Sequence, residues 1–193
     1  VGILTGGTSG FGYAMVRALL PQGANLAVFS VDEITEDALA ELRNTGRGEV
    51  EYYTKDILAH NASEEMVAQT MERFGQLDFV IANAGFAIRF EESLLTLPLD
   101  RLVEAMRTQF EIFPITFATL ALAAARVMAP RYETIEADEM GHRHDSGAIV
   151  VTLSEASLCP LRDDLIAYAA AKRASLSVME TLAAVLGPKN IRV

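Results

Sequence analysis

The chain has 193 residues, of which 51% are hydrophobic, so it is large enough for one domain with a sizeable core. Its 26 acidic and 16 basic residues give a net charge of −10, which argues against nucleic acid or an anionic membrane surface as a partner. The single cysteine, Cys159, excludes an internal disulfide and fits a reducing, cytoplasmic location.

Short apolar runs alternate with longer helix-like runs along the whole chain. We expect strands at 1–5, 25–30, 49–53, 77–82, 147–153 and from 191 onward. We expect helices at 10–21, 33–44, 61–74, 98–129 and 164–187. Most strand runs are continuously apolar, which is typical of parallel strands covered by helices on both faces. The sequence therefore predicts an α/β fold: a doubly wound, Rossmann-like parallel sheet in three α/β/α layers.

Both ends of the chain look cut, because it opens inside one apolar strand and stops where a sixth strand begins. We therefore expect a single dinucleotide-binding and catalytic domain over 1–193, truncated near the sixth strand. The longest apolar stretch, 112–129, contains Pro114 and Arg126, and it is too short and interrupted for a membrane span. A core or interface helix is the better interpretation.

The polar segment 131–146 is expected to be an exposed loop. Its His142 and His144 could form a metal site with Glu136 or Asp138. Alternating histidines in a polar loop are usually solvated, and no ligand set with recognisable spacing is present, so we expect no metal.

A glycine-rich turn, Thr-Gly-Gly-Thr-Ser-Gly-Phe-Gly at 5–12, separates the first expected strand from the first expected helix. Glycines let a backbone turn sharply and let a pyrophosphate approach closely, and a helix N-terminus offers it free N–H groups. The spacing differs from the G-x-G-x-x-G fingerprint, and an ordinary tight turn is the alternative. The position between strand and helix favours nucleotide binding by Gly6, Thr8, Ser9, Gly10, Phe11 and Gly12.

Tyr168 and Lys172 lie four residues apart at the start of an expected helix, so their side chains share one face. A free tyrosine has a pKa of about 10 and accepts protons poorly at neutral pH. A nearby lysine cation stabilises the phenolate and shifts that pKa downward, which suits acid–base catalysis. The alternative is an amphipathic helix with a packed tyrosine and an outward lysine.

These motifs, in this order, resemble the short-chain dehydrogenase/reductase family along essentially the whole chain. The resemblance implies that Asp56, with Ile57 beside it, meets the adenine ring. It implies that Asn83, Ala84 and Gly85 lie beside the adenine ribose. It also implies that Tyr168 exchanges the proton, while Lys172 supports it and holds the nicotinamide ribose.

The segment 147–154 of this chain resembles the family's strand that ends on the catalytic serine. This resemblance indicates Ser154 as that serine. That serine commonly lies thirteen residues before the tyrosine, a count that here falls on Glu155. Strand register favours Ser154 as the hydrogen-bond donor to the substrate carbonyl, and Ser157 is the alternative.

A second departure concerns the helix 98–129, which lacks the asparagine that usually helps to hold a water in the family's proton relay. Gln109 is the nearest polar amide, and Met106 or Phe110 occupies the family position. A catalytically weak subunit that senses cofactor or acts as a scaffold therefore remains the alternative function.

Residues at the end of the second expected strand and just after it bear on the cofactor preference. Ser30 stands where NAD-preferring relatives often have aspartate, and Val31 where NADP-preferring relatives often have arginine. Asp32 has the spacing of the ribose-binding acid, which would repel a 2′-phosphate, although it could instead cap the helix beginning at Glu33. Between NAD and NADP, these residues favour NAD.

The resemblance implies an oxidoreductase that transfers a hydride between a nicotinamide cofactor and a carbonyl or secondary alcohol. It implies a homodimer or homotetramer, because the family pairs the helices matching 98–129 and 164–187 across a subunit interface. The family's C-terminal lid and last strand are absent from the sequence. Non-redox dehalogenation ranks last, because those relatives typically lose the glycine turn and the lysine.

Overall fold

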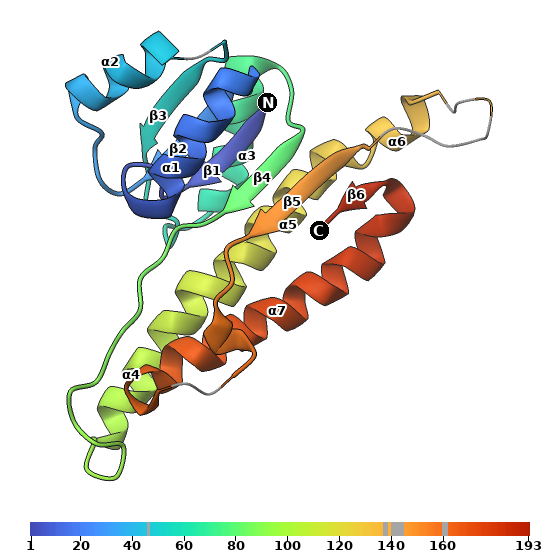
Figure 1. Cartoon of the computed structure of the whole chain (residues 1–193). Coiled ribbons are helices and arrows are strands. Elements are labelled where there is room, and N and C mark those ends of the chain that lie inside the picture. The colour runs from blue at the N-terminus through green and yellow to red at the C-terminus, as the bar shows by residue number, and fades with distance from the viewer. Residues whose placement is uncertain (46, 137–138, 140–144, 160–161) are drawn as a thin grey trace.

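The computed structural model of the chain describes residues 1–45, 47–136, 139, 145–159 and 162–193. Six parallel strands form one sheet in the order β3-β2-β1-β4-β5-β6 (Figure 1). The strands are β1 (Gly2–Thr5), β2 (Leu26–Ser30), β3 (Val50–Thr54), β4 (Phe79–Ala82), β5 (Gly147–Val151) and β6 (Ile191–Arg192). The order reverses between β1 and β4, as in a doubly wound sheet, so the predicted fold class is confirmed.

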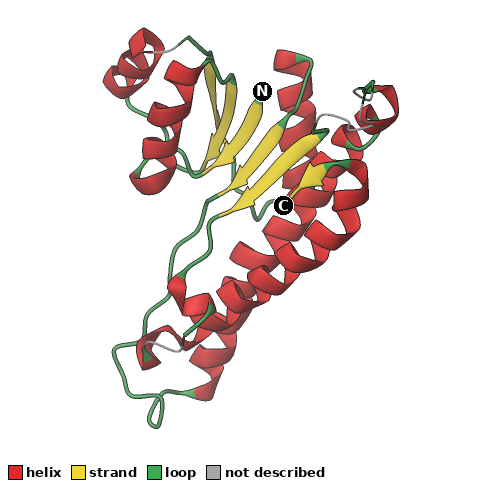
Figure 2. Cartoon of the chain, turned by 45° about the vertical axis from the view of Figure 1, so that its right-hand side comes forward, coloured by secondary structure: helices red, strands yellow, loops and turns green. Residues whose placement is uncertain are grey.

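Helices flank the sheet in the described part of the chain. They are α1 (Gly10–Leu19), α2 (Glu36–Thr45), α3 (Ala62–Phe74), α4 (Leu99–Phe110), α5 (Thr116–Met128), α6 (Arg131–Thr134) and α7 (Ile166–Leu186). Figure 2 shows α1 and α2 on one side of the sheet and α3, α5 and α7 on the other. The helical run α4–α5 and helix α7 lie side by side and extend beyond the carboxyl ends of the strands (Figures 1 and 2).

Two apolar cores separate these layers, because neighbouring residues of a strand point to opposite faces. Ile3 belongs to the core under α3, α5 and α7, whereas Leu4 packs with Val16 and Leu20 under α1. All four side chains are fully buried, and each contributes about 2 kcal/mol to folding. Burial of both strand faces explains why the strand segments read as continuous apolar runs.

The helix predicted over 98–129 is interrupted. A π turn at Glu111–Ile115, with Pro114 inside it, separates α4 from α5. Proline has no N–H to donate to the preceding turn, and its ring clashes with the carbonyl four residues earlier. At the end of this turn, the Thr116 hydroxyl donates a hydrogen bond to the Ile112 carbonyl at 2.5 Å. The Ile112 carbonyl therefore has a side-chain partner.

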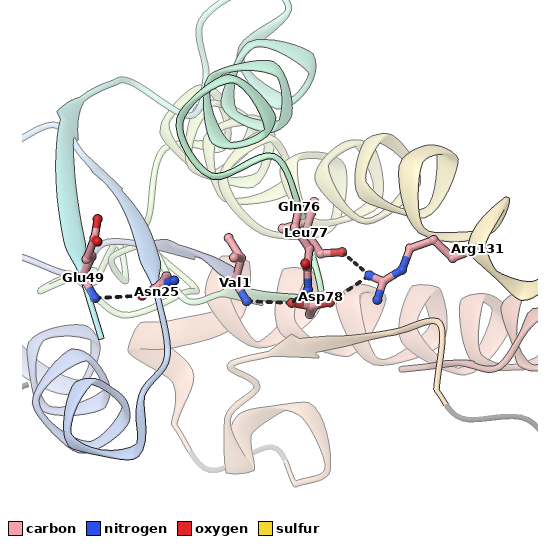
Figure 3. A network of polar contacts seen from close by, with 7 residues as sticks. All are labelled: Val1, Asn25, Glu49, Gln76, Leu77, Asp78 and Arg131. Carbon is pink, nitrogen blue, oxygen red and sulfur yellow. Dashed lines mark hydrogen bonds and ion pairs between the residues drawn. The ribbon is translucent and has the colours of Figure 1, made fainter. Parts of the chain in front are cut away.

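The segment predicted as an exposed loop, 131–146, begins with the short helix α6 instead. Arg131 at its start donates to the Asp78 carboxylate at 2.8 Å and to the Leu77 carbonyl at 3.0 Å (Figure 3). These contacts attach α6 to the beginning of β4. The metal-site candidates Asp138, His142 and His144 lie outside the described residues. Within those that are described, no three potential ligands gather.

One helical run, Leu99–Thr134, is long and apolar enough to cross a membrane by length and composition. More than half of its most apolar window, 56%, is buried inside the protein's own fold. The buried residues include Phe117, Leu120 and Ala121, which belong to the core under the sheet. This burial agrees with a core helix.

Candidate active site

A cleft of about 880 Å³ lies at the carboxyl ends of the strands, where doubly wound sheets bind ligands. All the residues predicted for the site line it: Gly6, Thr8, Ser9, Gly10, Phe11, Gly12, Ser30, Asp32, Asp56, Ile57, Asn83, Ala84, Gly85, Ser154, Tyr168 and Lys172. The structure therefore brings together segments that are far apart in sequence. Its lining also includes residues that were not predicted from the sequence, among them Lys55, Phe113 and Thr152.

At Gly6 and Gly12 the glycine turn packs too closely for a side chain. Gly6 has φ +71°, in the left-handed region that favours glycine. A Cβ on Gly12 would lie 2.0 Å from the Gly6 carbonyl oxygen and 2.8 Å from Nδ2 of Asn83. Glycine at position 12 therefore lets the start of α1 sit directly against the turn.

The N-terminus of α1 opens toward this cleft without a neutralising side chain. Ser9 stands at the N-cap with extended backbone, φ −152°, and its hydroxyl makes no capping hydrogen bond. The first turn of α1 carries no acidic residue. The first N–H groups of the helix, together with its dipole, therefore offer an uncompensated positive end that suits a phosphate group.

Asn83 ties together the ends of three strands. Its backbone N–H and that of Ala84 both donate to the Thr5 hydroxyl at 3.0 Å. Its side-chain amide donates to the carbonyls of Thr5 and Gly6 at 3.1 and 3.2 Å, and its oxygen accepts from the Thr152 hydroxyl at 3.1 Å. Thr5 and Thr152 were not predicted as site residues from the sequence. A hydroxyl residue ending a buried apolar strand was the signal available.

The end of β2 carries the residues expected at the adenosine ribose. Ser30 is buried, and its hydroxyl lies 3.0 Å from that of Thr8 in the glycine turn. In the loop that follows β3, a carboxylate oxygen of Asp56 accepts a hydrogen bond from the Leu58 N–H at 2.9 Å. Asp56 thereby fixes its own loop at the edge of the cleft.

Asp32 is exposed at the same end of the cleft. The alternative role of Asp32, capping a helix that begins at Glu33, is wrong. Helix α2 begins at Glu36, and the Thr35 hydroxyl accepts from the Ala38 N–H at 3.3 Å in the capping position. The Thr35 hydroxyl, rather than the Asp32 carboxylate, thus caps the start of α2.

Tyr168 and Lys172 share one face of α7, as their spacing predicts. The Lys172 side chain is buried, with a relative exposure of 4%, and its Nζ donates to the Thr152 carbonyl at 2.5 Å. Nζ lies 5.8 Å from the centroid of the Tyr168 ring. Burial lowers the pKa of Lys172 from 10.5 to about 8, because the charged form loses its hydration.

Ser154 caps a short 3₁₀ turn at Glu155–Ser157. Its hydroxyl oxygen accepts from the Ala156 N–H at 3.2 Å, and its own N–H donates to the Ser157 hydroxyl at 3.4 Å. Ser157 is buried and does not line the cleft, whereas Ser154 and Glu155 do. Of these three candidates, Ser154 alone brings a hydroxyl into the cleft.

Gln109, the amide nearest to the missing asparagine, performs a different task. It is fully buried, donates from Nε2 to the Phe86 carbonyl at 3.0 Å and accepts from the Ile88 N–H at 3.4 Å. It therefore holds the loop after β4. Met106 and Phe110 are partly buried against apolar neighbours.

The sequence is similar to those of known dehydrogenases. The sequence pattern of the family described as short chain dehydrogenase matches residues 1–193. The cis-1,2-dihydrobenzene-1,2-diol dehydrogenase of Pseudomonas putida is 29% identical over 193 residues, which are 100% of this chain and 63% of that protein. The 2,5-dichloro-2,5-cyclohexadiene-1,4-diol dehydrogenase of Sphingobium indicum is 30% identical over 194 residues, 99% of this chain and 68% of that protein.

Solved structures share the fold. An NAD⁺-bound xylitol dehydrogenase has a TM-score of 0.82 and is 26% identical in sequence. The match covers 100% of this chain and 66% of the xylitol dehydrogenase chain. The chain thus spans less than two thirds of the length of the first curated relatives it matches, at 63%.

Proposed function

The chain belongs to the short-chain dehydrogenase/reductase family, and from this premise we propose that the protein is an oxidoreductase acting on a small secondary alcohol or carbonyl compound with a nicotinamide dinucleotide. One observation carries the proposal: Ser154, Tyr168 and Lys172 line the same cleft as the glycine turn. A reacting group and a dinucleotide could therefore meet there.

The residues of this cleft fit a dinucleotide. The side-chain-free approach at Gly12 and the uncapped N-terminus of α1 suit the pyrophosphate. Ser30, Asp32 and Asp56 would meet the adenosine half, and Asn83 would support the turn beside it. When bound, the nicotinamide supplies or accepts the hydride.

The proton chemistry falls to the protein's own side chains. Tyr168 would give a proton to the carbonyl oxygen, or take one from the alcohol, at its hydroxyl oxygen. The Lys172 ammonium would stabilise the phenolate, and its burial keeps competing water away. Because the Ser154 oxygen already accepts from Ala156, its hydrogen is free to donate to the substrate oxygen.

We propose that NAD is preferred to NADP. The carboxylate of Asp32 lines the cleft near the end of β2 and would repel a 2′-phosphate. Lys55, a cation in the same lining, is paired with Glu65 at 2.5 Å and is not free to bind that phosphate. Fluorescence titration should give at least tenfold tighter binding of NADH than of NADPH; equal affinities would contradict the preference.

The substrate search should begin with cyclic diols and polyols. Two relatives are named for cyclic diols and one structural neighbour for xylitol. Beyond Ser154, the cleft is bordered by Phe86, Ala87 and Leu153, apolar surfaces that suit a hydrocarbon ring.

The central test is Tyr168→Phe, which removes the proton-exchanging oxygen and keeps the ring. We expect kcat on an accepted substrate to fall at least 100-fold, because the general acid–base group is gone, while the NADH dissociation constant stays within about twofold. Steady-state kinetics and NADH titration measure the two effects. Full turnover in this variant would refute the assignment.

A cofactor-sensing or scaffold subunit is the competing function, and the helix asparagine missing from α4 favours it. NADH binding by the wild-type protein without turnover on a broad alcohol and carbonyl panel would support this alternative over the enzyme.

A further inference from the structure

The π turn between α4 and α5 brings an aromatic ring into the active-site cleft. Pro114 prevents a regular helical turn there, and the preceding residue, Phe113, is buried with a relative exposure of 6% while lining the cleft. Phe113 also lines a smaller cavity, together with Thr5, Lys172 and Ser175. The ring therefore lies beside the Tyr168–Lys172 face of α7.

Phe113 contacts both residues of the proposed proton chemistry. The Lys172 Nζ lies 3.9 Å from the centroid of its ring, which is close for a cation over an aromatic face. The Tyr168 ring meets it edge-on, with centroids 5.4 Å apart and planes at 79°. A Cβ on Gly85 would lie 2.3 Å from Cε1 of Phe113, so glycine at position 85 leaves room for the ring.

The surroundings of Lys172 make this contact significant. An ammonium has three N–H donors, and the hydrogen bond found for it in the described part of the chain goes to the Thr152 carbonyl. Tyr168 is the titratable group that faces it from its own helix. Asp56 and Glu155 line the same cleft, and burial lowers the pKa of Lys172. The negative face of the Phe113 ring thus replaces hydration that the ammonium has lost.

We propose that Phe113 is a positioning residue whose ring face holds the charged end of Lys172 in the cleft beside Tyr168. This contact gives the buried ammonium electrostatic support from an apolar side chain. Its effect on turnover rests on the proposed function, whereas the contact itself does not.

The test is a series of phenylalanines at position 113 carrying one, two or three ring fluorines. Fluorine withdraws charge from the ring face and changes the shape little, so burial of Lys172 stays the same while the attraction weakens. The chain has three lysines, Lys55, Lys172 and Lys189, so NMR of their ε-methylene groups can follow each one, and Lys172→Met assigns the signal.

We expect the pKa of Lys172 to fall stepwise along the series, by about 0.5 to 1 unit for three fluorines. The same analogues at Phe90, a buried ring of another cluster, should leave it unchanged. A pKa that stays constant along the series, or that moves equally with Phe90, would overturn the proposal.

Turnover provides the second readout. Phe113→Leu keeps an apolar side chain without a ring face and should lower kcat at neutral pH at least fivefold, whereas Phe113→Tyr should restore most of it. If Phe113→Leu folds by circular dichroism and keeps the wild-type pH profile, the positioning role is wrong. If the wild-type protein shows no turnover at all, the proposed function fails, and the NMR titration still decides the contact.

Discussion

At the scale of single residues, Lys172 is a buried charge that donates a hydrogen bond to the Thr152 carbonyl. Burial lowers its pKa to about 8, well below that of an unfolded lysine. A folded-state pKa below the unfolded value means that the charged form opposes folding. The charged lysine destabilises the folded state to the full extent below about pH 8. This destabilisation disappears as the pH rises toward the pKa of the unfolded state.

We therefore predict that the wild-type protein gains about 2 to 3 kcal/mol of unfolding free energy relative to Lys172→Met between pH 7 and pH 10. Urea denaturation of both proteins at the two pH values measures this, and the comparison cancels other groups that titrate at alkaline pH. A difference independent of pH would mean that Lys172 is better hydrated than its burial indicates.

Gly12 offers a second residue-scale prediction, because a Cβ there would collide with the Gly6 carbonyl. Gly12→Ala should weaken NADH binding at least tenfold by displacing the turn from α1. The matched control is Gly23→Ala, since Gly23 has φ +89° but open space around it. That control should cost about 1 kcal/mol of stability through backbone strain and leave NADH affinity unchanged. Wild-type NADH affinity in Gly12→Ala would show that the glycine turn does not bind the phosphates.

At the scale of elements, Asn83 joins the carboxyl ends of β1, β4 and β5 through one side chain. Asn83→Ala should lower the unfolding free energy by about 2 to 4 kcal/mol, because buried carbonyls and the Thr152 hydroxyl lose their partner. Asn44→Ala on the exposed face of α2 is the matched control and should change stability by less than about 0.5 kcal/mol. Chemical denaturation of the two variants separates these outcomes.

Much of this architecture could be predicted from local patterns. The alternation of apolar strands and amphipathic helices predicted the parallel α/β sheet. The glycine turn between strand and helix predicted where the cleft lies. The π turn was missed, although Pro114 inside an expected helix is a visible signal for a break. Contacts such as Phe113 with Tyr168 could not be predicted, because they join distant segments through packing that no periodicity encodes.

At the scale of the whole molecule, apolar side chains remain exposed on the long helices. Ile115 and Leu122, seven residues apart on α5 and the turn before it, are 45% and 43% exposed, and Val103 on α4 is 46% exposed. Such surfaces often mark contacts between subunits. We predict a homodimer or homotetramer at micromolar concentration, and Leu122→Asp should shift it toward the monomer in sedimentation equilibrium. A monomeric wild-type protein would contradict this.

The place of β1 in the middle of the sheet has a consequence for how the protein forms during synthesis. One edge of β1 pairs with β2, beginning at Gly2 and Leu26, whereas its other edge pairs with β4 at Phe79. That second edge must stay open until the ribosome has released the later strand, because its partner does not yet exist. A nascent chain of this topology therefore presents an unpaired, apolar strand edge for a long interval, which is where we expect chaperones to bind it.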